Sequence, residues 1–507
     1  MTFLKLPSSA RAVVSHNLTG RIARPATNRV LHTKKMSLVR YLRSMLPKGY
    51  SKEEFGTVTK NSLRHWQTIG FASLLLMLCM TAFAQGAPAP EPAKNDTGDT
   101  AWMLVSSALV LFMTPGLALF YGGMVRAKNI LNMLMKSFIA ISVVTVLWVL
   151  VGYRLSFAPG GPFIGGFSWA GLKGVGLEPN STYSATFPHQ VHMVYQLMFA
   201  IITPALISGA VAERMKFSTY VVFIGLWSLL VYAPLAHMVW GLGDGQGFLG
   251  KLGALDFAGG TVVHISSGMS ALVLAVLLGK RKHAGEARPH NLPMTLIGTG
   301  ILWFGWFGFN AGSAGASGSL AASAFVVTHI AAATAGLSWV IVEWIAYKKP
   351  TALGFASGAV AGLVAITPAS GYVGPVAALI MGAVISPICF SAIKLKSKLG
   401  YDDTLDVFGV HGVGGTVGAL LTGVFCQKAI NSLGADAGMD QFIKQAIGAG
   451  VAIGYSIVVT LILGLILKAT MGLRVSEEAE IAGLDLSEHG ETAYADLSGG
   501  EAEGIAH

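Results

Sequence analysis

Two histidines lie inside long apolar segments of the chain, where an ionisable side chain is unusual. His264 ends the stretch DFAGGTVVH and His411 ends the stretch DVFGVH, and each is followed four residues later by a glycine, Gly268 or Gly415. Imidazole titrates near neutral pH and can both donate and accept hydrogen bonds, so it suits proton transfer. A lone buried histidine is more often an ordinary core residue. Because two of them occur in matching surroundings, we expect a shared functional role.

The same pair does not make a metal centre or an enzyme active site. Zinc sites need three or four ligands, and the sequence has no HExxH motif, no cysteine pair and no third histidine near either residue. No nucleophile with a partnered base is recognisable. We therefore expect no metal, no cofactor and no enzymatic activity. Cys389 and Cys426 lie in apolar segments and are expected to be free core residues.

An aspartate precedes each histidine. Asp256 lies eight residues before His264, and Asp406 lies five residues before His411. Near the start of a helix, an aspartate commonly accepts hydrogen bonds from free backbone N–H groups, which is the simplest role for both. The charge of Asp256 would in addition make its surroundings more attractive to a cation.

Aromatic residues form a second group of candidates. Trp240 closes one apolar segment, the run WFGWFGFNAGS closes another at Ser313, and Tyr195 and Phe199 lie on a third. Such residues can form an aromatic belt at the membrane surface. They can also form a vestibule whose ring faces attract a small cation by about 0.5–2 kcal/mol. Residue types alone leave both interpretations open.

The elements that position these side chains are membrane-spanning helices. Only 12% of the 507 residues are charged and 53% are hydrophobic, whereas soluble domains carry about 25% charged residues. This composition excludes a large soluble enzyme and a disordered protein. Helices are expected because a lipid-exposed backbone has to satisfy its own hydrogen bonds. The eleven predicted spans are 101–124, 130–153, 189–211, 218–240, 258–279, 292–312, 321–346, 352–368, 374–395, 404–427 and 443–471.

Lysine and arginine are distributed unequally between the loops on the two sides. Fourteen lie in one set of loops and five in the alternate set, which predicts that the richer set is cytoplasmic. The N-terminus is then outside and the C-terminus inside. His264 and His411 fall in the fifth and tenth spans, which would be equivalent helices of two five-span halves with opposite orientation. The predicted fold is an all-α integral membrane protein with two inverted five-helix repeats and one extra helix.

The net charge of +10 comes from the N-terminal region, because residues 1–84 hold 13 Lys and Arg against two acidic residues. A basic stretch, an apolar run of about 12 residues and an AFA motif predict a secretory signal peptide. Its basic part is too long, so we expect translation to start at Met36 or Met45, an unrecognised leader being the alternative. We further predict a Pro/Ala-rich extracytoplasmic linker at 85–100, a membrane domain at 101–471 and an acidic cytoplasmic tail at 472–507. Such a tail is commonly disordered.

From about residue 101 to residue 494 the chain resembles the ammonium transporter (Amt/Mep/Rh) family, and its bacterial Amt branch in particular. The motifs that carry the resemblance are PGLALFYGG, DFAGGTVVH, GWFGFNAGS, TPASGY and DVFGVHG. The resemblance implies a homotrimer of eleven-span subunits in the bacterial inner membrane, each with its own hydrophobic pore. It also implies that His264 and His411 line that pore and that Phe199 and Phe309 form a stacked gate. The residues that match the family's outer ammonium-recruiting site and its surroundings are Trp240, Ser313, Phe199, Phe309, Asp256, Ala258, Gly259 and Tyr195.

Three further expectations follow from the resemblance. Tyr195 stands where many members have phenylalanine, and its hydroxyl would hydrate the vestibule. The tail from Gly472 resembles the family's ordered C-terminal segment, and a P-II signalling protein would be a possible partner at the cytoplasmic face. The expected function is transport of ammonium, which loses a proton and crosses as ammonia. The alternative is an ammonium sensor that signals through its cytoplasmic face with little flux.

Overall fold

The computed structural model describes residues 94–282 and 288–494, which are almost entirely helical. The predicted signal peptide and residues 85–93 of the predicted linker lie outside the described residues. Between α5 and α6, the strands β1 (Pro179–Asn180) and β2 (Ser184–Pro188) form a short antiparallel hairpin.

The first half of the bundle extends from α3 to α10. Its helical segments are α3 (Thr97–Met124), η1 (Ala127–Asn129), α4 (Ile130–Leu147), η2 (Trp148–Gly152), α5 (Tyr153–Phe157), η3 (Ala170–Leu172), α6 (His189–Ile207), α7 (Phe217–Trp227), η4 (Ser228–Tyr232), α8 (Ala233–Trp240), η5 (Gly243–Gly245), α9 (Phe248–Leu252), η6 (Gly260–Ile265) and α10 (Ser266–Leu278). Of these, η2, η4 and η6 are π-helical turns that continue directly into the next α-helix.

The second half and the tail follow the gap after residue 282. Their helical segments are α11 (Leu292–Ala311), η8 (Gly312–Ala314), α12 (Ser319–Tyr347), α13 (Ala352–Ile366), α14 (Pro375–Leu399), η9 (Phe408–Gly412), α15 (Val413–Phe425), α16 (Met439–Thr470), α17 (Glu477–Ala482) and α18 (Leu484–His489). The segment η9 is again a π-helical turn.

Ten continuous helical segments in the described chain are long and apolar enough to cross a membrane, and α13 is a shorter apolar helix of 15 residues. These segments coincide with the eleven predicted spans, although the spanning count and the orientation stay predictions. Several boundaries differ by a few residues, those of the first and third spans among them. The first helix begins at Thr97 because the Asp96 side chain accepts the Asp99 N–H and caps it. The third ends at Ile207 rather than 211, where the chain turns toward Glu213.

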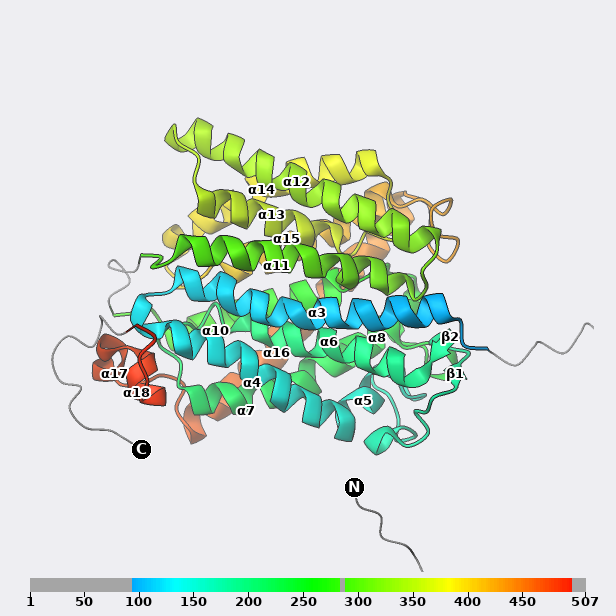
Figure 1. Ribbon diagram of the computed structural model, residues 1–507, viewed down its shortest axis with the longest axis horizontal. Helices are drawn as coiled ribbons and strands as arrows, with labels where there is room; N and C mark the ends of the chain where they lie inside the picture. Colours follow the sequence, from blue (N-terminus) through cyan, green and yellow to red (C-terminus); the bar gives the residue numbers. More distant parts are fainter. Residues whose placement is uncertain (1–93, 283–287, 495–507) are drawn as a thin grey trace, which may run out of the picture. The chain divides into compact units, whose positions relative to one another are not determined.

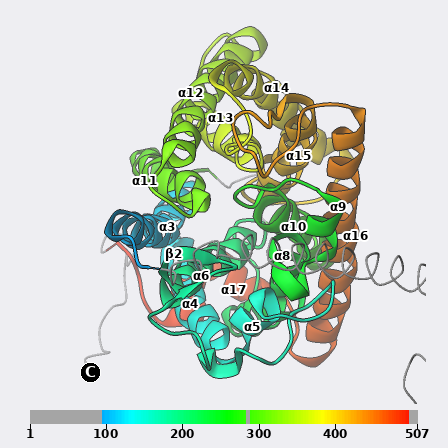
Figure 2. The same ribbon diagram turned by 90° about the vertical axis from the view of Figure 1, so that its right-hand side faces the viewer.

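The helices run between two ends of the bundle, the hairpin end and the tail end (Figure 1). The hairpin end holds β1, β2 and the start of α3, and the tail end holds α17 and α18. Viewed from the hairpin end, α11 to α15 occupy one side, α3 to α10 occupy the other, and α16 lies along the edge of both (Figure 2).

The two halves meet where η6–α10 crosses η9–α15. The segment η6 contacts α15 and η9 contacts α10, so the start of each helix lies beside the body of the other and they run in opposite directions. A Cβ on Gly268 would lie 2.1 Å from the Gly412 nitrogen, and one on Gly415 would lie 2.9 Å from His264 Cβ. The glycines four residues after the histidines are therefore required for this close approach.

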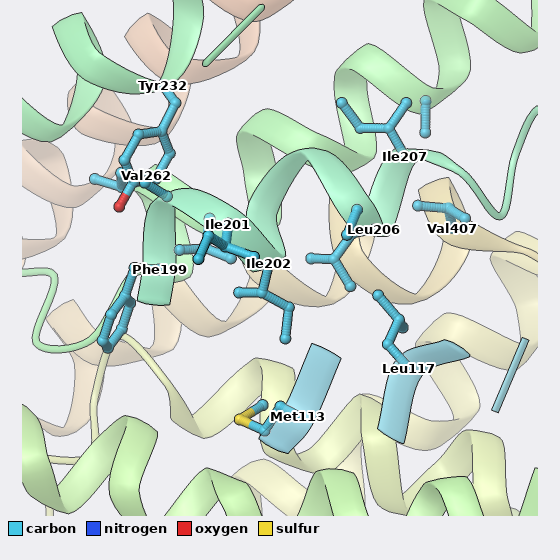
Figure 3. Close-up of a cluster of buried hydrophobic side chains, with 14 of the residues drawn as sticks. Met113, Leu117, Phe199, Ile201, Ile202, Leu206, Ile207, Tyr232, Val262 and Val407 are labelled. Atoms are coloured by element: carbon cyan, nitrogen blue, oxygen red, sulfur yellow. The ribbon is translucent and has the colours of Figure 1, made fainter. Parts of the chain in front are cut away.

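Around the crossing, apolar side chains from several helices form one buried cluster (Figure 3). Met113 and Leu117 of α3 contribute to it, together with Ile202 and Leu206 of α6 and Val262 of η6. Cys389 and Cys426 are buried and free, as predicted.

The C-terminal tail is folded as far as it is described, and it does not behave as a disordered end. It binds the tail end of the bundle through its backbone and carboxylates: Leu484 N–H donates to Asn129 Oδ1, and Asp485 Oδ1 accepts the Asn132 N–H, both at 2.8 Å. Glu480 accepts the Lys282 N–H at 2.7 Å. These contacts agree with the ordered tail that the resemblance implies.

A buried ion-pair network ties four loops together beneath the tail. Glu213, whose side chain is fully buried, lies 3.1 Å from Arg126 Nε and 3.0 Å from Arg281 Nη1, and Arg281 Nε lies 2.9 Å from Asp402. Burial raises the pKa of the Glu213 carboxyl, but the charge and the backbone N–H of Arg126, with Arg281, hold it below its ordinary value. The carboxylate therefore stabilises the fold while it stays ionised.

Glu213→Gln is expected to lower the free energy of unfolding by about 3 kcal/mol, because two partly buried guanidinium groups lose their charged partner. In the unsubstituted protein, a lowered pKa means that this stabilisation is present above the pKa of a free glutamate, about 4.3, and is lost as the pH falls through the lower folded value. Thermal unfolding in detergent between pH 7 and pH 3 measures both effects.

Glu477→Gln is the matched control, because Glu477 pairs with Lys282 at 3.1 Å with both side chains about half exposed. Such a surface pair contributes less than about 1 kcal/mol. If the two variants unfold at the same temperature at pH 7, the network does not hold the loops as described.

Candidate functional site

Three cavities follow one another through the middle of the bundle. At the hairpin end, a vestibule of about 490 Å³ is bordered by Tyr195, Phe199, Trp240, Asp256 and Ser313 among others. Next comes a narrow cavity of about 10 Å³ lined by apolar side chains and both histidines. Toward the tail end, an exit cavity of about 50 Å³ is bordered by His411 and Asp406. The predicted recruitment and pore residues thus lie along one path.

A pair of phenylalanines separates the vestibule from the narrow cavity. Phe199 borders the vestibule and Phe309 borders the cavity, and their ring centroids lie 4.2 Å apart at an interplanar angle of 35°. Phe199 is also 6.2 Å from the Trp240 ring, and Phe309 is 6.1 Å from the His264 ring. Both phenylalanines are buried and lie between the two spaces, at the position where the resemblance implies a gate.

The two histidines face each other across the narrow cavity. His264 Nδ1 lies 3.2 Å from His411 Nδ1, so the pair shares one proton between the two nitrogens. The Trp306 ring stacks on His264 at 5.5 Å. His264 Nε2 is buried and has no hydrogen-bond partner in the described part of the chain. A cavity of this size is at the lower limit for one water-sized molecule.

Asp256 holds the turn that carries His264. Its carboxylate accepts the N–H groups of Gly259, Gly260, Thr261 and Val262 at 2.6–3.0 Å, and it therefore caps η6, as the simplest interpretation predicts. Burial raises its pKa even though these four donors oppose the rise.

Neither Ala258 nor Gly259 is among the residues that border the vestibule. Gly259 adopts φ of 112°, in the left-handed region that glycine favours, and its carbonyl accepts the N–H groups of Val263 and His264. Ala258 is fully buried beside it. Both residues belong to the capped turn.

Asp403, rather than Asp406, is the counterpart of Asp256 in the second half. It lies eight residues before His411, is buried, and accepts the Phe408 N–H at the start of η9 at 2.7 Å. Burial raises its pKa to about 6. Asp406 instead has φ of 61° and forms an ion pair with Lys396. The equal spacing of eight residues was the signal in the sequence that would have identified Asp403.

Tyr195 borders the vestibule, and its hydroxyl bonds to the end of α11; hydration of the vestibule by this hydroxyl stays a prediction. Its Oη lies 2.9 Å from the carbonyl oxygens of Gly308 and Phe309 and 3.2 Å from Ser313 Oγ. The hydroxyl therefore fastens α6 to the end of α11 and fixes Ser313 at the vestibule wall. Trp240 is fixed in a similar way, since its Nε1–H donates to the Asp256 carbonyl at 2.8 Å.

Known proteins resemble this chain in both sequence and structure. A model of the Ammonium Transporter Family matches residues 101–494. An ammonium transporter of Bacillus subtilis is 52% identical over 404 residues, which cover 79% of this chain and 99% of the relative. The crystal structure of Mep2 from Candida albicans is 38% identical with a TM-score of 0.72, covering 79% of this chain and 90% of that one. A solved sensor Amt protein is 29% identical with a TM-score of 0.72, covering 77% and 98%.

Asp256→Asn is expected to lower the free energy of unfolding by about 2 kcal/mol, because an amide has one acceptor oxygen and leaves two of the four N–H groups facing its NH₂. Thermal unfolding in detergent measures the change. Asp96→Asn is the control: Asp96 accepts one N–H at an exposed helix start, where asparagine caps equally well. Equal shifts in the two variants would contradict the capping role of Asp256.

Proposed function

The chain belongs to the Ammonium Transporter Family, and we propose from this premise that it recruits ammonium at the vestibule and conducts it across the membrane as ammonia. The observation that carries the proposal is the sequence of spaces on one path: a roomy aromatic vestibule, a closed pair of phenylalanines and a narrow cavity with two facing histidines.

Recruitment depends on groups that attract a cation. The ring faces of Trp240 and Phe199 border the vestibule, and a cation over such a ring gains about 0.5–2 kcal/mol. Ser313 Oγ, held by Tyr195, offers an acceptor for one N–H of ammonium. Asp256 adds negative charge nearby, although its carboxylate oxygens already accept four backbone N–H groups.

Selection follows from the narrow cavity. Placing a charged group in apolar surroundings costs about 2.5–3.5 kcal/mol even on the lenient membrane-insertion scale. Ammonium can avoid this cost by losing a proton, whereas potassium, of the same charge and similar size, cannot. Ammonia in the cavity can donate to and accept from the facing imidazoles, and the unpartnered His264 Nε2 supports this role.

We base the proposed orientation, membrane, oligomeric state and partner on the resemblance to the family. We place the vestibule outside and the tail in the cytoplasm, with the protein in the bacterial inner membrane as a homotrimer. Large apolar side chains remain exposed along α12 and α14, including Ile345 and Val376, which supports burial of that face in lipid or against another subunit. A P-II signalling protein is the proposed partner at the tail end.

The alternative is a sensor that binds ammonium and signals with little flux. The similarity to a solved sensor Amt protein is the observation that favours it. Uptake after an ammonium jump separates the two functions, since a transporter accumulates ammonium in proteoliposomes continuously, whereas a sensor only binds it.

His264→Phe is expected to reduce ammonium uptake into proteoliposomes at least about tenfold, because a phenyl ring fills the cavity and cannot exchange a proton. Uptake by the unsubstituted protein should exceed that of empty liposomes and should not be matched by potassium. His329→Phe is the control, since His329 is an exposed residue of α12 away from the path. Absence of uptake by the unsubstituted protein would contradict transport, and unchanged uptake by His264→Phe would contradict the pore.

A further inference from the structure

Beside the vestibule, three titratable side chains form a continuous hydrogen-bonded chain that the proposed function does not use. Tyr153 Oη lies 2.7 Å from His189 Nε2 and 3.0 Å from His192 Nδ1. All three side chains are buried. His189 and His192 are three residues apart on α6, so they present their rings on one face of the helix, and Tyr153 begins α5 opposite them.

The hydroxyl between two imidazoles has one proton, so it donates to one ring and accepts from the other. The hydrogen bonds therefore have two possible arrangements: Tyr153 donates to His189 and accepts from His192, or the reverse. Changing from one to the other moves a proton from one histidine to the other without moving a heavy atom. Such a chain is suited to carrying a proton, because each neutral imidazole has one nitrogen that donates and one that accepts, so one proton can enter the ring as another leaves it.

One end of the chain opens on the vestibule. His192 borders that cavity together with Tyr183 and Phe157. Its Nδ1 is engaged by Tyr153, which leaves Nε2 free of partners in the described part of the protein. Tyr195 and Phe199 follow on the same helix one and two turns further along and border the same cavity, so one face of α6 extends from this chain to the gate.

The other end lies at the hairpin end of the bundle. His189 is the first residue of α6 directly after β2, and its backbone N–H donates to the Glu178 carbonyl at 3.1 Å. Trp169 covers the chain, with its ring stacked on Tyr153 at 5.6 Å and at 4.7 Å from His189. His192 and His189, the two terminal residues of the hydrogen-bonded series, therefore both lie at the hairpin end of the bundle.

Few charged groups face this cluster. Arg154, next to Tyr153, is directed to the Gly166 carbonyl and the Phe167 ring. On α8, His237 is engaged by the carbonyls of Ser156 and Gly161. Asp256 borders the vestibule that His192 also borders. Tyr183 stacks on His192 at 5.0 Å. In the described chain, no carboxylate bonds to either histidine, so neither ring is held in the charged form by an ion pair.

We propose that His192, Tyr153 and His189 form a proton outlet that returns the proton of ammonium to the side from which it was recruited. The inference rests on the proposed function, in which ammonium loses a proton before the gate. An N–H bond of ammonium breaks, directly or through vestibule water, and its electron pair stays on ammonia while a bond forms to His192 Nε2. The Nδ1 proton of His192 passes to Tyr153 Oη, the hydroxyl proton passes to His189 Nε2, and His189 Nδ1 releases its proton to water.

Chemical rescue tests the outlet. His192→Ala removes the first acceptor and leaves space beside the vestibule, so ammonium uptake into proteoliposomes should fall at least about tenfold. Imidazole added at the vestibule side should restore uptake in proportion to its neutral form, and imidazole enclosed on the other side should not. His329→Ala, on α12, should show neither the loss nor the rescue.

Tyr153→Phe is a second variant that separates loss of proton transfer from a folding defect. It keeps the ring that stacks on Trp169 and removes only the hydroxyl. It should lower uptake as His192→Ala does, with its unfolding temperature matching that of Tyr220→Phe. Tyr220 is an equally buried tyrosine whose hydroxyl donates to the Lys136 carbonyl at 3.2 Å, and its variant should transport normally.

The outlet hypothesis is contradicted if His192→Ala loses uptake and imidazole does not restore it, or if neither variant loses uptake. Either result leaves the proposed transport function unaffected. Absence of uptake by the unsubstituted protein overturns the proposed function, and the outlet with it. Rescue of His192→Ala by imidazole, with a loss in Tyr153→Phe and none in Tyr220→Phe, supports it.

Discussion

The cost of holding a charge in an apolar passage is the constraint on which the rest of the structure depends. The cavity beside His264 and His411 has about 10 Å³ of space, and its other walls are apolar side chains. An ion there would lose its water without gaining a counter-charge. Among the described residues, no carboxylate lines that cavity: Asp256 borders the vestibule and Asp406 borders the exit cavity. Inside it, one nitrogen of the histidine pair donates a hydrogen bond to the other.

The backbone turns that carry the histidines follow the same constraint. Each histidine lies in a π-helical turn at the start of a helix, and an aspartate lies eight residues earlier. Asp256 accepts four backbone N–H groups there, and Asp403 accepts that of Phe408. The carboxylates of Asp256 and Asp403 thus compensate exposed backbone dipoles close to the path. An aspartate at this position therefore occurs once in each half, at the start of two helices that cross in opposite directions.

Much of this could be predicted from residue types and spacing. The apolar segments, the histidine pair, the glycines four residues later and the capping role of Asp256 followed from hydropathy and local rules. The function of individual residues came from long motifs that resemble a known family. What could not be predicted depends on contacts between distant segments: the Tyr195 hydroxyl bonding to α11, and Tyr153 joining two histidines. A side chain's partner on another helix leaves no trace in its own neighbourhood of the sequence.

The close crossing of the two halves has a mechanical consequence. Gly268 lies against the main chain of Gly412, and Gly415 lies against the His264 Cβ and the main chain around it. Main chain inside a helix has no rotamers, so the distance between the two helices at the crossing is set by a rigid contact, whereas the space beside the histidines is set by the side chains that line it. The two helices cannot separate at this point without breaking that contact, so the crossing is a rigid joint between the two halves of the bundle.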